Sequence, residues 1–594
     1  MKIKHLLEGK VKININKFMT SVCTCAMVMI LGACGSTDKE NKVYTDLNKY
    51  YNISDIGQYE GAAVVINGEE SGSAVICDDK YYMLYEDVRT YIDDHYYFDK
   101  TENILTYASS KHVYDVHAGK NEYTEDGITK QFDSVVAYVI DENTYISIDF
   151  VVLMNNYVNV EAFNKPERVV VTTAQKQNVA KAAKEGKLRV EAGKDKEIVT
   201  DIKKDDELMI INKMEKWSYV CRGDGMRGYI ENSNLSEANE KEVAHEESWI
   251  TKEPYTYISK DYKICLGWHQ MEYEAGNDSF GSVTSDANPL NVISPTWFKI
   301  IDDVGGISSL ASKNYVNKAH NKNMEVWGLI SDFNSDADGN AYINKVVSVT
   351  SSRRKLIDNI MTEAKKCGMD GINIDFERIR KASAEGYVQF IRELAIRCDS
   401  AGLVLSVDMY SPTADNAYYD RESIAEAADY LIIMGYDEHW SGCKKAGSVA
   451  SLTFVTNGIN NTLKEAPADR VINAVPFYTR LWCEDSPENA PENAVLIEDS
   501  VNGDYALSSI SKGMEDAMKL MEQKKVSLSW RDEEAQYYGE YYSGETFVRV
   551  WLEDKKSLAA KLAVMKQNNL AGVACWKLGL ESKEVWETIE EYLH

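Results

Sequence analysis

The chain contains the octapeptide Asp370-Gly-Ile-Asn-Ile-Asp-Phe-Glu377. In a β-strand the side chains alternate between two faces, so this stretch has one apolar and one polar side. The two faces are Ile372, Ile374 and Phe376 on one side and Gly371, Asn373, Asp375 and Glu377 on the other. A strand buried between helices is usually apolar on both faces, so the polar column requires an explanation. Two neighbouring carboxylates raise each other's pKa, which suits a general acid, whereas a solvated edge strand would leave both acids in water.

Strand and helix patterns alternate from residue 258 to residue 594, as they do in βα units around a parallel sheet. The candidate strands are residues 262–267, 292–294, 324–330, 371–377, 403–408, 430–436, 471–475 and 572–576, with amphipathic helices such as 354–366 and 387–399 between them. Eight strands in this length predict an α/β fold, a (β/α)8 or TIM barrel. A doubly wound sheet would also alternate, but no glycine-rich phosphate loop follows a strand.

The barrel is interrupted by an insertion at about 483–550, which is too long for a simple loop. We expect a helix over residues 508–523 and a hairpin of strands 536–542 and 546–551 across Ser543-Gly544. The insertion could form one wall of a cleft. Trp530 and Trp551 are candidates for stacking on a sugar, although core packing explains each of them as well.

In a TIM barrel the chemistry lies where the strands end, because the βα loops meet there. The polar and aromatic strand ends are Glu377 on the fourth strand, Asp408 and Tyr410 on the fifth, Tyr436 and Asp437 on the sixth, Arg480 and Trp482 after the seventh, and Trp576 on the eighth. Acids that transfer protons, together with aromatic faces that stack on sugar rings, are what a sugar-cleaving cleft requires. The pattern therefore indicates a glycosidase.

The strand motifs resemble those of glycoside hydrolase family 18, the chitinase-like enzymes. Residues 370–377 match its D-G-x-x-x-D-x-E motif, and Met434-Gly-Tyr-Asp437 matches M-x-Y-D on the sixth strand. Pro476-Phe-Tyr-Thr-Arg480 is similar to a P-x-Y-x-R stretch, and Gly572-Val-Ala-Cys-Trp576 to the last strand. The motifs occur in the family's order over about 330 residues. Many chitinases carry a further Asp at the position of Asn373. Members of the spore-cortex and spore-germination branch resemble this chain in having Asn there.

The resemblance implies a mechanism in which the 2-acetamido oxygen of the substrate attacks the sugar carbon. Glu377 would then be the general acid and base, Asp375 would orient the acetamido group, and Tyr436 would hold its oxygen. The implied substrate-binding residues are Asn373, Asp437, Trp576, Met434, Tyr410 and Arg480. Asn373 could donate a hydrogen bond to Asp375 without adding charge. Packing is an alternative for Met434, and an ion pair is an alternative explanation of Asp408 and Arg480.

The N-terminus resembles the signal of a bacterial lipoprotein. A lysine-rich start is followed by an apolar run from Met19 to Ala33 that is too short for a comfortable membrane span. The run ends in Leu31-Gly-Ala-Cys34. We expect residues 1–33 to be a signal peptide, Cys34 to be lipidated, and residues 34–48 to be a spacer. The mature chain would then be anchored by lipid outside the cell membrane of a Gram-positive-type bacterium. A cleaved signal or an uncleaved anchor with a chance cysteine is the alternative.

Two small domains are expected between this spacer and the barrel. Residues 49–165 show short alternating strands and many tyrosines, and resemble an α+β stalk domain similar to the copper amine oxidase N-terminal domain, without implying copper. Residues 166–240, with Trp217 and Tyr229, resemble a bacterial SH3 domain, a small all-β barrel that often binds cell-wall material. Both aromatic residues are equally explained as core anchors. Residues 241–257 form a polar linker.

Composition narrows the class of partner. A net charge of −28 over 594 residues argues against nucleic acid or an anionic membrane surface as a partner of the folded part. Neither cysteines nor histidines show metal-ligand spacing, so no metal and no cofactor is expected. We predict a monomeric enzyme that hydrolyses β-1,4 bonds in a glycan that contains N-acetylglucosamine. Peptidoglycan is the first candidate substrate, and chitin or host glycans are the alternatives. A glycan-binding barrel without activity is the alternative of another class.

Overall fold

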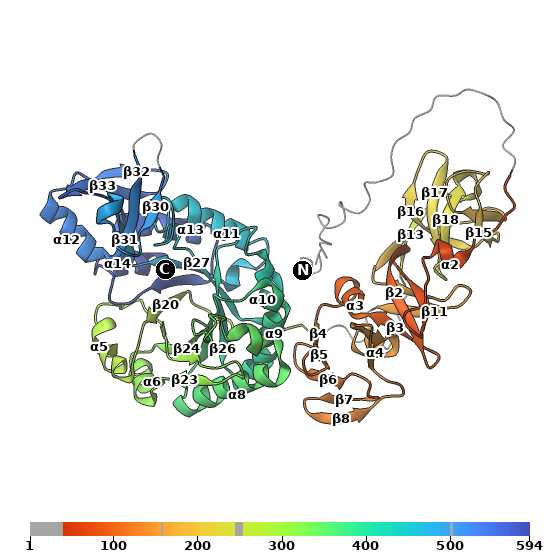
Figure 1. The fold of residues 1–594 in the computed structure, drawn as a ribbon, viewed down its shortest axis with the longest axis horizontal. Helices are drawn as coiled ribbons and strands as arrows, with labels where there is room; N and C mark the ends of the chain where they lie inside the picture. The colour runs from red at the N-terminus through yellow and green to blue at the C-terminus, as the bar shows by residue number, and fades with distance from the viewer. Residues whose placement is uncertain (1–39, 156–157, 244–253, 499–502) are drawn as a thin grey trace, which may run out of the picture. The chain divides into compact units, whose positions relative to one another are not determined.

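The structure is a computed structural model that describes residues 40–155, 158–243, 254–498 and 503–594 (Figure 1). The predicted signal peptide, the predicted lipidation site Cys34 and most of the predicted linker lie outside the described residues. The chain divides into two compact units. One combines the residues up to Tyr50 with Asn178–Glu240, and the other combines Tyr51–Gln177 with Lys241–His594. None of the helices in the described part of the chain is long and apolar enough to cross a membrane.

The larger unit contains a closed barrel of eight parallel strands, which confirms the predicted TIM barrel. The strands, in barrel order, are β20 (Ile264–His269), β21 (Val292–Pro295), β24 (Glu325–Ser331), β25 (Gly371–Asp375), β26 (Val404–Tyr410), β27 (Tyr430–Met434), β28 (Val471–Pro476) and β35 (Gly572–Trp576). The ring closes because β35 pairs with β20 and β21 pairs with β24. Each predicted strand overlaps one of these.

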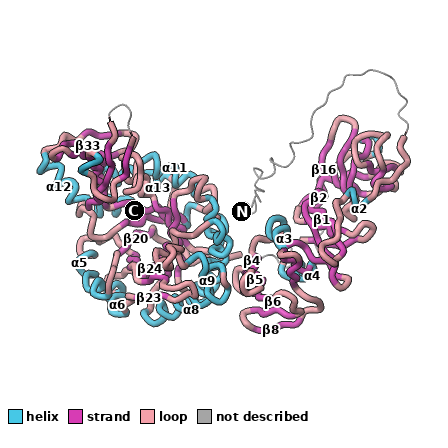
Figure 2. The backbone as a smooth tube through the Cα atoms, viewed as in Figure 1, coloured by secondary structure: helices cyan, strands magenta, loops and turns pink. Residues whose placement is uncertain are grey.

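Helices surround the barrel, as Figure 2 shows in cyan around the magenta strands. They are α5 (Phe280–Val283), α6 (Lys313–His320), α7 (Ile343–Ser348), α8 (Thr350–Cys367), α9 (Ala384–Ala401), α10 (Arg421–Ala427), α11 (Leu452–Thr462), α13 (Lys555–Gln567) and α14 (Val585–Leu593). A short hairpin, β22 (Phe298–Ile300) with β23 (Ile307–Ser309), lies beside β24. Both α8 and α9 end at a left-handed glycine, Gly368 at φ 73° and Gly402 at φ 68°, because only glycine adopts that conformation without strain.

The two faces of β25 have different surroundings. Ile372 and Ile374 are fully buried in the large apolar core that includes residues of α8 and α9. Gly371 starts the opposite, inward face, where an added Cβ would lie 2.7 Å from the Trp327 ring. Above this glycine the inward positions become polar, with Asn373 next to Ser406 of β26. The barrel interior is thus apolar near the start of β25 and polar toward its carboxyl end.

The insertion forms a second antiparallel sheet. Its elements are β29 (Tyr478–Asp485), β30 (Val495–Ile497), β31 (Tyr505–Gly513), α12 (Met514–Lys524), β32 (Ser529–Arg531), β33 (Gln536–Ser543) and β34 (Thr546–Leu552). The predicted hairpin is present as β33 and β34. The predicted helix over 508–523 was partly wrong, because residues 508–513 pair with β29 and the helix begins only at Met514. Sheet pairing here overrides the local helical pattern.

A seven-stranded sheet and a five-stranded sheet form the region before the barrel in the same unit. The seven-stranded sheet contains β1 (Glu60–Ile66), β2 (Glu69–Cys77), β3 (Lys80–Leu84), β9 (Ala137–Ile140), β10 (Asn143–Ser147), β11 (Asn159–Phe163) and β12 (Arg168–Thr172). The other contains β4 (Tyr96–Asp99), β5 (Ile104–Ala108), β6 (Val113–His117), β7 (Glu122–Glu125) and β8 (Ile128–Gln131), and the helices are α3 (Tyr85–Tyr91) and α4 (Ile148–Met154). Because β12 pairs with β1, this region continues past the expected boundary at 165.

In its described residues, the smaller unit is a seven-stranded sheet with one short α-helix, α2 (Leu47–Tyr50). Its strands are β13 (Lys176–Lys181), β14 (Gly186–Arg189), β15 (Ile198–Ile202), β16 (Glu207–Lys213), β17 (Trp217–Arg222), β18 (Arg227–Glu231) and β19 (Asn239–Glu242). Tyr44 forms a bridge with Ile198, so the end of the expected spacer 34–48 packs with this unit. The stalk-like and SH3-like assignments remain predictions.

Candidate active site

The polar column of β25 lies at the carboxyl end of the strand, inside the barrel. Asn373 is fully buried, Asp375 is 7% exposed, and Glu377 is half-buried just after the strand ends. On the neighbouring strand β26, Asp408 is 3% exposed. Three carboxylates from two adjacent strands therefore share a small region at the mouth of the barrel.

Asn373 is held by four hydrogen bonds from three other strands. Its Oδ1 accepts from Trp268 Nε1 (2.8 Å) and Ser294 Oγ (3.0 Å). Its Nδ2 donates to Ser406 Oγ (3.1 Å) and to Asp408 Oδ1 (2.8 Å). The expectation that Asn373 binds substrate and bonds to Asp375 is therefore corrected: the amide is buried, both of its ends are used, and its carboxylate partner is Asp408.

Asp375 is surrounded by negative charge. Burial raises the pKa of Asp375 well above its ordinary value, and the nearby carboxylates of Glu377, Asp408 and Asp332 raise it further. Within the described residues its carboxylate has neither an ion pair nor a hydrogen bond. Asp375 thus tends to hold a proton until a ligand supplies a donor.

Glu377 also has the electrostatics of a general acid. Burial raises its pKa, a hydrogen bond from Tyr410 lowers it, and the charge of Asp437 raises it again, with a net upward shift. The Tyr410 hydroxyl lies 3.4 Å from the Glu377 carbonyl oxygen. Tyr410 therefore contacts the residue that carries the acid.

The sequence analysis missed Asp332, which directly follows β24. Its Oδ1 accepts the backbone N–H of Glu377 (3.0 Å) and its Oδ2 that of Arg378 (2.8 Å). The side chain is 1% exposed, and burial raises its pKa to about 7. Its only sequence signal was a carboxylate after the apolar run of the third strand, the same signal that drew attention to Glu377.

Residues directly after β27 and residues of β29 form the next part of the wall. Tyr436 is partly exposed, and burial raises the pKa of its hydroxyl well above 10, so the hydroxyl stays protonated. Asp437 accepts a hydrogen bond from Tyr478 Oη (2.5 Å), and Arg480 lies 3.7 Å from the same oxygen. The ion partner of Arg480 is therefore Asp437 and not Asp408. Met434 is buried at the end of β27, which agrees with the packing alternative.

Aromatic residues complete the site. Trp576 is partly exposed at the end of β35, and its ring lies 5.7 Å from that of Trp268, the residue that donates to Asn373. Trp482 is fully buried and donates to the Gly447 carbonyl, so it supports the loop after β27. In the insertion, Trp551 packs against Tyr538 at 4.9 Å, and Lys556 lies over the Trp530 ring.

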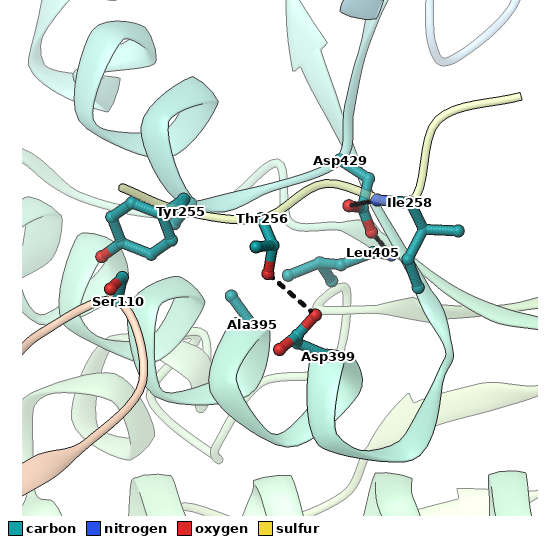
Figure 3. Close-up of a pocket in the computed structure, with 9 residues that line it drawn as sticks. Ser110, Tyr255, Thr256, Ile258, Ala395, Asp399, Leu405 and Asp429 are labelled. Atoms are coloured by element: carbon teal, nitrogen blue, oxygen red, sulfur yellow. Dashed lines mark hydrogen bonds between the residues drawn. The ribbon is translucent and has the colours of Figure 1, made fainter. Parts of the chain in front are cut away.

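A small cavity lies away from this mouth, near the start of β26 (Figure 3). Its lining consists of Ser110, Tyr255, Thr256, Ile258, Ala395, Asp399, Leu405, Ala427 and Asp429. Asp429 accepts the N–H groups of Ile258 and Leu405, and Thr256 donates to Asp399. With a volume of about 10 Å³ the cavity has room for a single water molecule at most.

One group of side chains has the composition of a metal site. The ligand atoms of Asp93, Asp94 and His95 lie within 4.8 Å of one another. However, Asp93 accepts hydrogen bonds from Asn155 and Tyr107, and Arg392 pairs with Asp94 at 3.0 Å. Because a guanidinium already supplies the positive charge, we interpret this group as a buried polar cluster.

Comparisons with known proteins agree with the barrel and its motifs. Residues 288–581 match the family model "Glycosyl hydrolases family 18". The chain is 26% identical over 325 residues to the uncharacterized glycosylase YvbX of Bacillus subtilis, which covers 53% of this chain and 88% of that relative. It is 26% identical over 247 residues to the cortical fragment-lytic enzyme of the same organism, covering 39% of this chain and 52% of the relative.

A solved structure is also similar, the spore cortex-lytic enzyme SleL of Bacillus megaterium QM B1551. The match has a TM-score of 0.47 and 20% identity, and covers 58% of this chain and 76% of SleL. The family model that matches residues 288–581 assigns this parallel barrel, with carboxylates at the ends of its strands, to the glycosidases. The chain carries a glycosidase domain of glycoside hydrolase family 18.

Proposed function

We propose that this protein hydrolyses β-1,4 bonds that follow N-acetylglucosamine residues, with retention of configuration and with help from the substrate's own acetamido group. The observation that carries the proposal is the pair formed by the buried Asp375 and the half-buried Glu377, both with raised pKa, at the mouth of the barrel. A carboxyl group that keeps its proton near neutral pH is suited to protonate a glycosidic oxygen.

In the proposed reaction, the glycosidic oxygen takes the Glu377 proton as the bond to the sugar carbon breaks. The acetamido oxygen attacks that carbon, forming an oxazolinium-like intermediate. Asp375 accepts the acetamido N–H and stabilises the positive charge that develops there. Water then attacks the carbon and gives its proton back to Glu377, and two inversions at one carbon leave the configuration unchanged.

Tyr436 and Trp576 would hold the same sugar. The Tyr436 hydroxyl is protonated at all working pH values, so it can donate to the acetamido oxygen. The partly exposed Trp576 ring offers an apolar face for the sugar ring to pack on. Asp437 and Arg480, which lie 3.7 Å apart, offer further polar contacts to sugar hydroxyls.

We propose peptidoglycan as the substrate. A relative named as a cortical fragment-lytic enzyme supports a wall glycan. The predicted lipid anchor at Cys34 and the SH3-like prediction for residues 166–240 would keep the enzyme next to the cell wall. Chitin and host glycans have the same N-acetylglucosamine chemistry. Chitin-type oligomers are the second candidate substrate, because the chain is 26% identical over 257 residues to a human di-N-acetylchitobiase.

The decisive experiment compares substrates and variants in parallel. The chain from residue 35 onward is incubated with purified peptidoglycan and with chitin oligomers, and the products are identified by mass spectrometry. We expect reducing N-acetylglucosamine ends from peptidoglycan, and a loss of at least about 10²-fold in kcat for Glu377→Gln. Glu540→Gln on the exposed face of β33 is the control and should be fully active. Full activity of Glu377→Gln, or sugar binding without turnover by the wild type, contradicts the proposal.

A further inference from the structure

Two arginines follow the proposed acid directly. Arg378 and Arg380 lie one and three positions after Glu377, on the segment that leaves β25 at the mouth of the barrel. Arg378 is partly exposed and Arg380 is exposed. In a chain with a net charge of −28, two positive charges beside the acid require an explanation.

The Arg378 guanidinium is held by neutral groups of the loop after β24. Its Nη1 donates to the carbonyl oxygen of Phe333 (2.7 Å) and to Ser335 Oγ (2.6 Å), and its Nη2 lies 3.5 Å from the carbonyl oxygen of Gly339. Within the described residues this guanidinium forms no ion pair, and its Nε donates no hydrogen bond. The edge formed by Nε and Nη2 is therefore available, and that edge can bind a carboxylate through two parallel hydrogen bonds.

Arg380 also has a neutral partner. Its Nη2 donates to Asn340 Oδ1 over 3.1 Å, and no ion pair to Arg380 is found in the part of the chain that the structure describes. The nearest acid is Asp336, whose pKa is lowered first by the backbone N–H of Asn340 and less by the charge of Arg380. Because Asp336 already accepts the N–H groups of Asp338 and Asn340, both arginines keep their charge for a ligand.

The backbone that carries the two arginines is fixed. Asn344 of α7 donates to the carbonyl oxygen of Arg378 (3.0 Å) and accepts the N–H of Arg380 (2.7 Å). Asp332 accepts the N–H of Arg378 over 2.8 Å. Donors that are held in place before binding lose little conformational entropy when a ligand arrives, so this segment is suited to recognise an anion.

The chemistry of the proposed reaction indicates which anion can reach this segment. Glu377 would protonate the C4 oxygen of the leaving sugar. In peptidoglycan the sugar that follows N-acetylglucosamine is muramic acid, which carries a lactyl group on C3, directly beside that oxygen. The same position in chitin carries only a hydroxyl group. A side chain that recognises the lactyl carboxylate, or a peptide attached to it, must therefore lie next to the acid, as Arg378 and Arg380 do.

We propose that Arg378 and Arg380 form a carboxylate-binding site for the leaving sugar, which favours a glycan containing muramic acid over chitin. This inference rests on the proposed function. The carboxylate binds to Nε and Nη2 of Arg378, and Arg380 supplies a second positive charge. The carboxylate belongs either to the lactyl group itself or to the peptide attached to it, and the experiments below separate these two sources.

The first test compares kcat/KM on peptidoglycan with kcat/KM on the same peptidoglycan after its carboxyl groups have been converted to neutral amides. Arg378→Gln and Arg380→Gln should each lower the ratio of the two values by about 10-fold, the effect of losing a hydrogen bond to a charged group. Arg397→Gln is the matched control, because Arg397 is an exposed arginine near the end of α9, at the opposite end of the barrel, where it pairs with Asp358. Its ratio should equal that of the wild type.

An equal loss of activity on both substrates would mean that the arginines only support the loop after β24, and it would overturn the proposal. Repeating the comparison on a glycan from which the peptides have been removed identifies the source of the carboxylate. A ratio that still depends on Arg378 supports the lactyl carboxylate, and dependence on Arg378 that is confined to the intact peptidoglycan supports a carboxylate of the peptide.

The second test requires no turnover. In the Glu377→Gln background, calorimetry measures the binding of N-acetylglucosaminyl-N-acetylmuramic acid and of di-N-acetylchitobiose, two disaccharides that differ by the lactyl group. Adding Arg378→Gln should weaken the binding of the first, relative to the second, by about 10-fold. If the wild type cleaves no glycan but this difference is found, the proposed function fails and the carboxylate site stands. If the wild type cleaves peptidoglycan but neither test depends on the arginines, the carboxylate site fails and the proposed function stands.

Discussion

The carboxylate of Asp332 accepts a hydrogen bond of 3.0 Å from the backbone N–H of Glu377. Asp332 lies at the end of the third barrel strand, and Glu377 lies just past the end of the fourth. The other oxygen of the same carboxylate accepts a hydrogen bond of 2.8 Å from the backbone N–H of Arg378. A buried carboxylate thus fixes the peptide that carries the proposed acid. Neither strand could do this alone, because the chain leaves the sheet directly after Asp375.

Asp332→Asn should reduce kcat by about 10- to 100-fold with little change in KM, because a displaced acid harms the transition state more than ground-state binding. The Asn amide would turn an N–H group toward one of the two backbone donors. Asp336→Asn, at an exposed position of the same loop, is the control and should match the wild type. Steady-state kinetics on one glycan measures both. A raised KM with unchanged kcat would point instead to a substrate contact.

Tyr436→Phe should lower kcat by about 10²-fold, because it removes one preorganised donor from the proposed acetamido site. Burial keeps the Tyr436 hydroxyl protonated, so its removal should leave the alkaline limb of the pH profile where it was. Tyr538→Phe in the insertion is the control. A variant as active as the wild type would show that the hydroxyl does not contact the reacting sugar.

The stability of the protein should decrease from pH 5 to pH 8. Asp332 has a pKa of about 7 in the folded protein and 3.8 as its ordinary value, so the folded state binds more protons than the unfolded state between these values. Asp429, at about 6, adds to this up to its own pKa. Stability is therefore greatest below pH 4 for these groups and is lost as pH rises through 6 and 7. Urea unfolding at fixed ionic strength measures the slope, and a rise in stability over this range would contradict the assignment.

Glu393→Gln should destabilise the larger unit by about 3–5 kcal/mol, because it leaves a buried guanidinium without its counter-charge. Arg353, fully buried on α8, donates to Glu393 of α9 at 3.0 Å, and Arg354 donates to the other carboxylate oxygen at 3.2 Å. The exposed pair Arg397 and Asp358 joins the same two helices, so Asp358→Asn is the control and should cost about 1 kcal/mol or less. Denaturant midpoints of the two variants give the comparison, and equal effects would argue against a buried ion pair.

The barrel could be predicted because the sequence patterns that indicate its strands and helices are local. Eight apolar runs, most of them separated by helical patterns, are readable from spacing alone, and each predicted strand is present. The helix predicted over 508–523 was wrong up to residue 513, because residues 508–513 pair with Cys483–Tyr478 of β29. No local sequence pattern contains the contribution of a pairing partner. For the same reason the boundary at 165 missed β12, which pairs with β1 about 100 residues earlier.

By itself, the sequence determined the column Asn373, Asp375 and Glu377, because alternation along one strand sets which side chains share a face. It also determined that the strand ends carry acids and aromatic rings. Only the tertiary structure decided the partners across strands. Asn373 bonds to Trp268, Ser294, Ser406 and Asp408 instead of Asp375, and Asp332 holds the peptide of Glu377. These contacts depend on barrel closure and on the register between strands, which bring together residues separated by 33 to 105 positions in the chain.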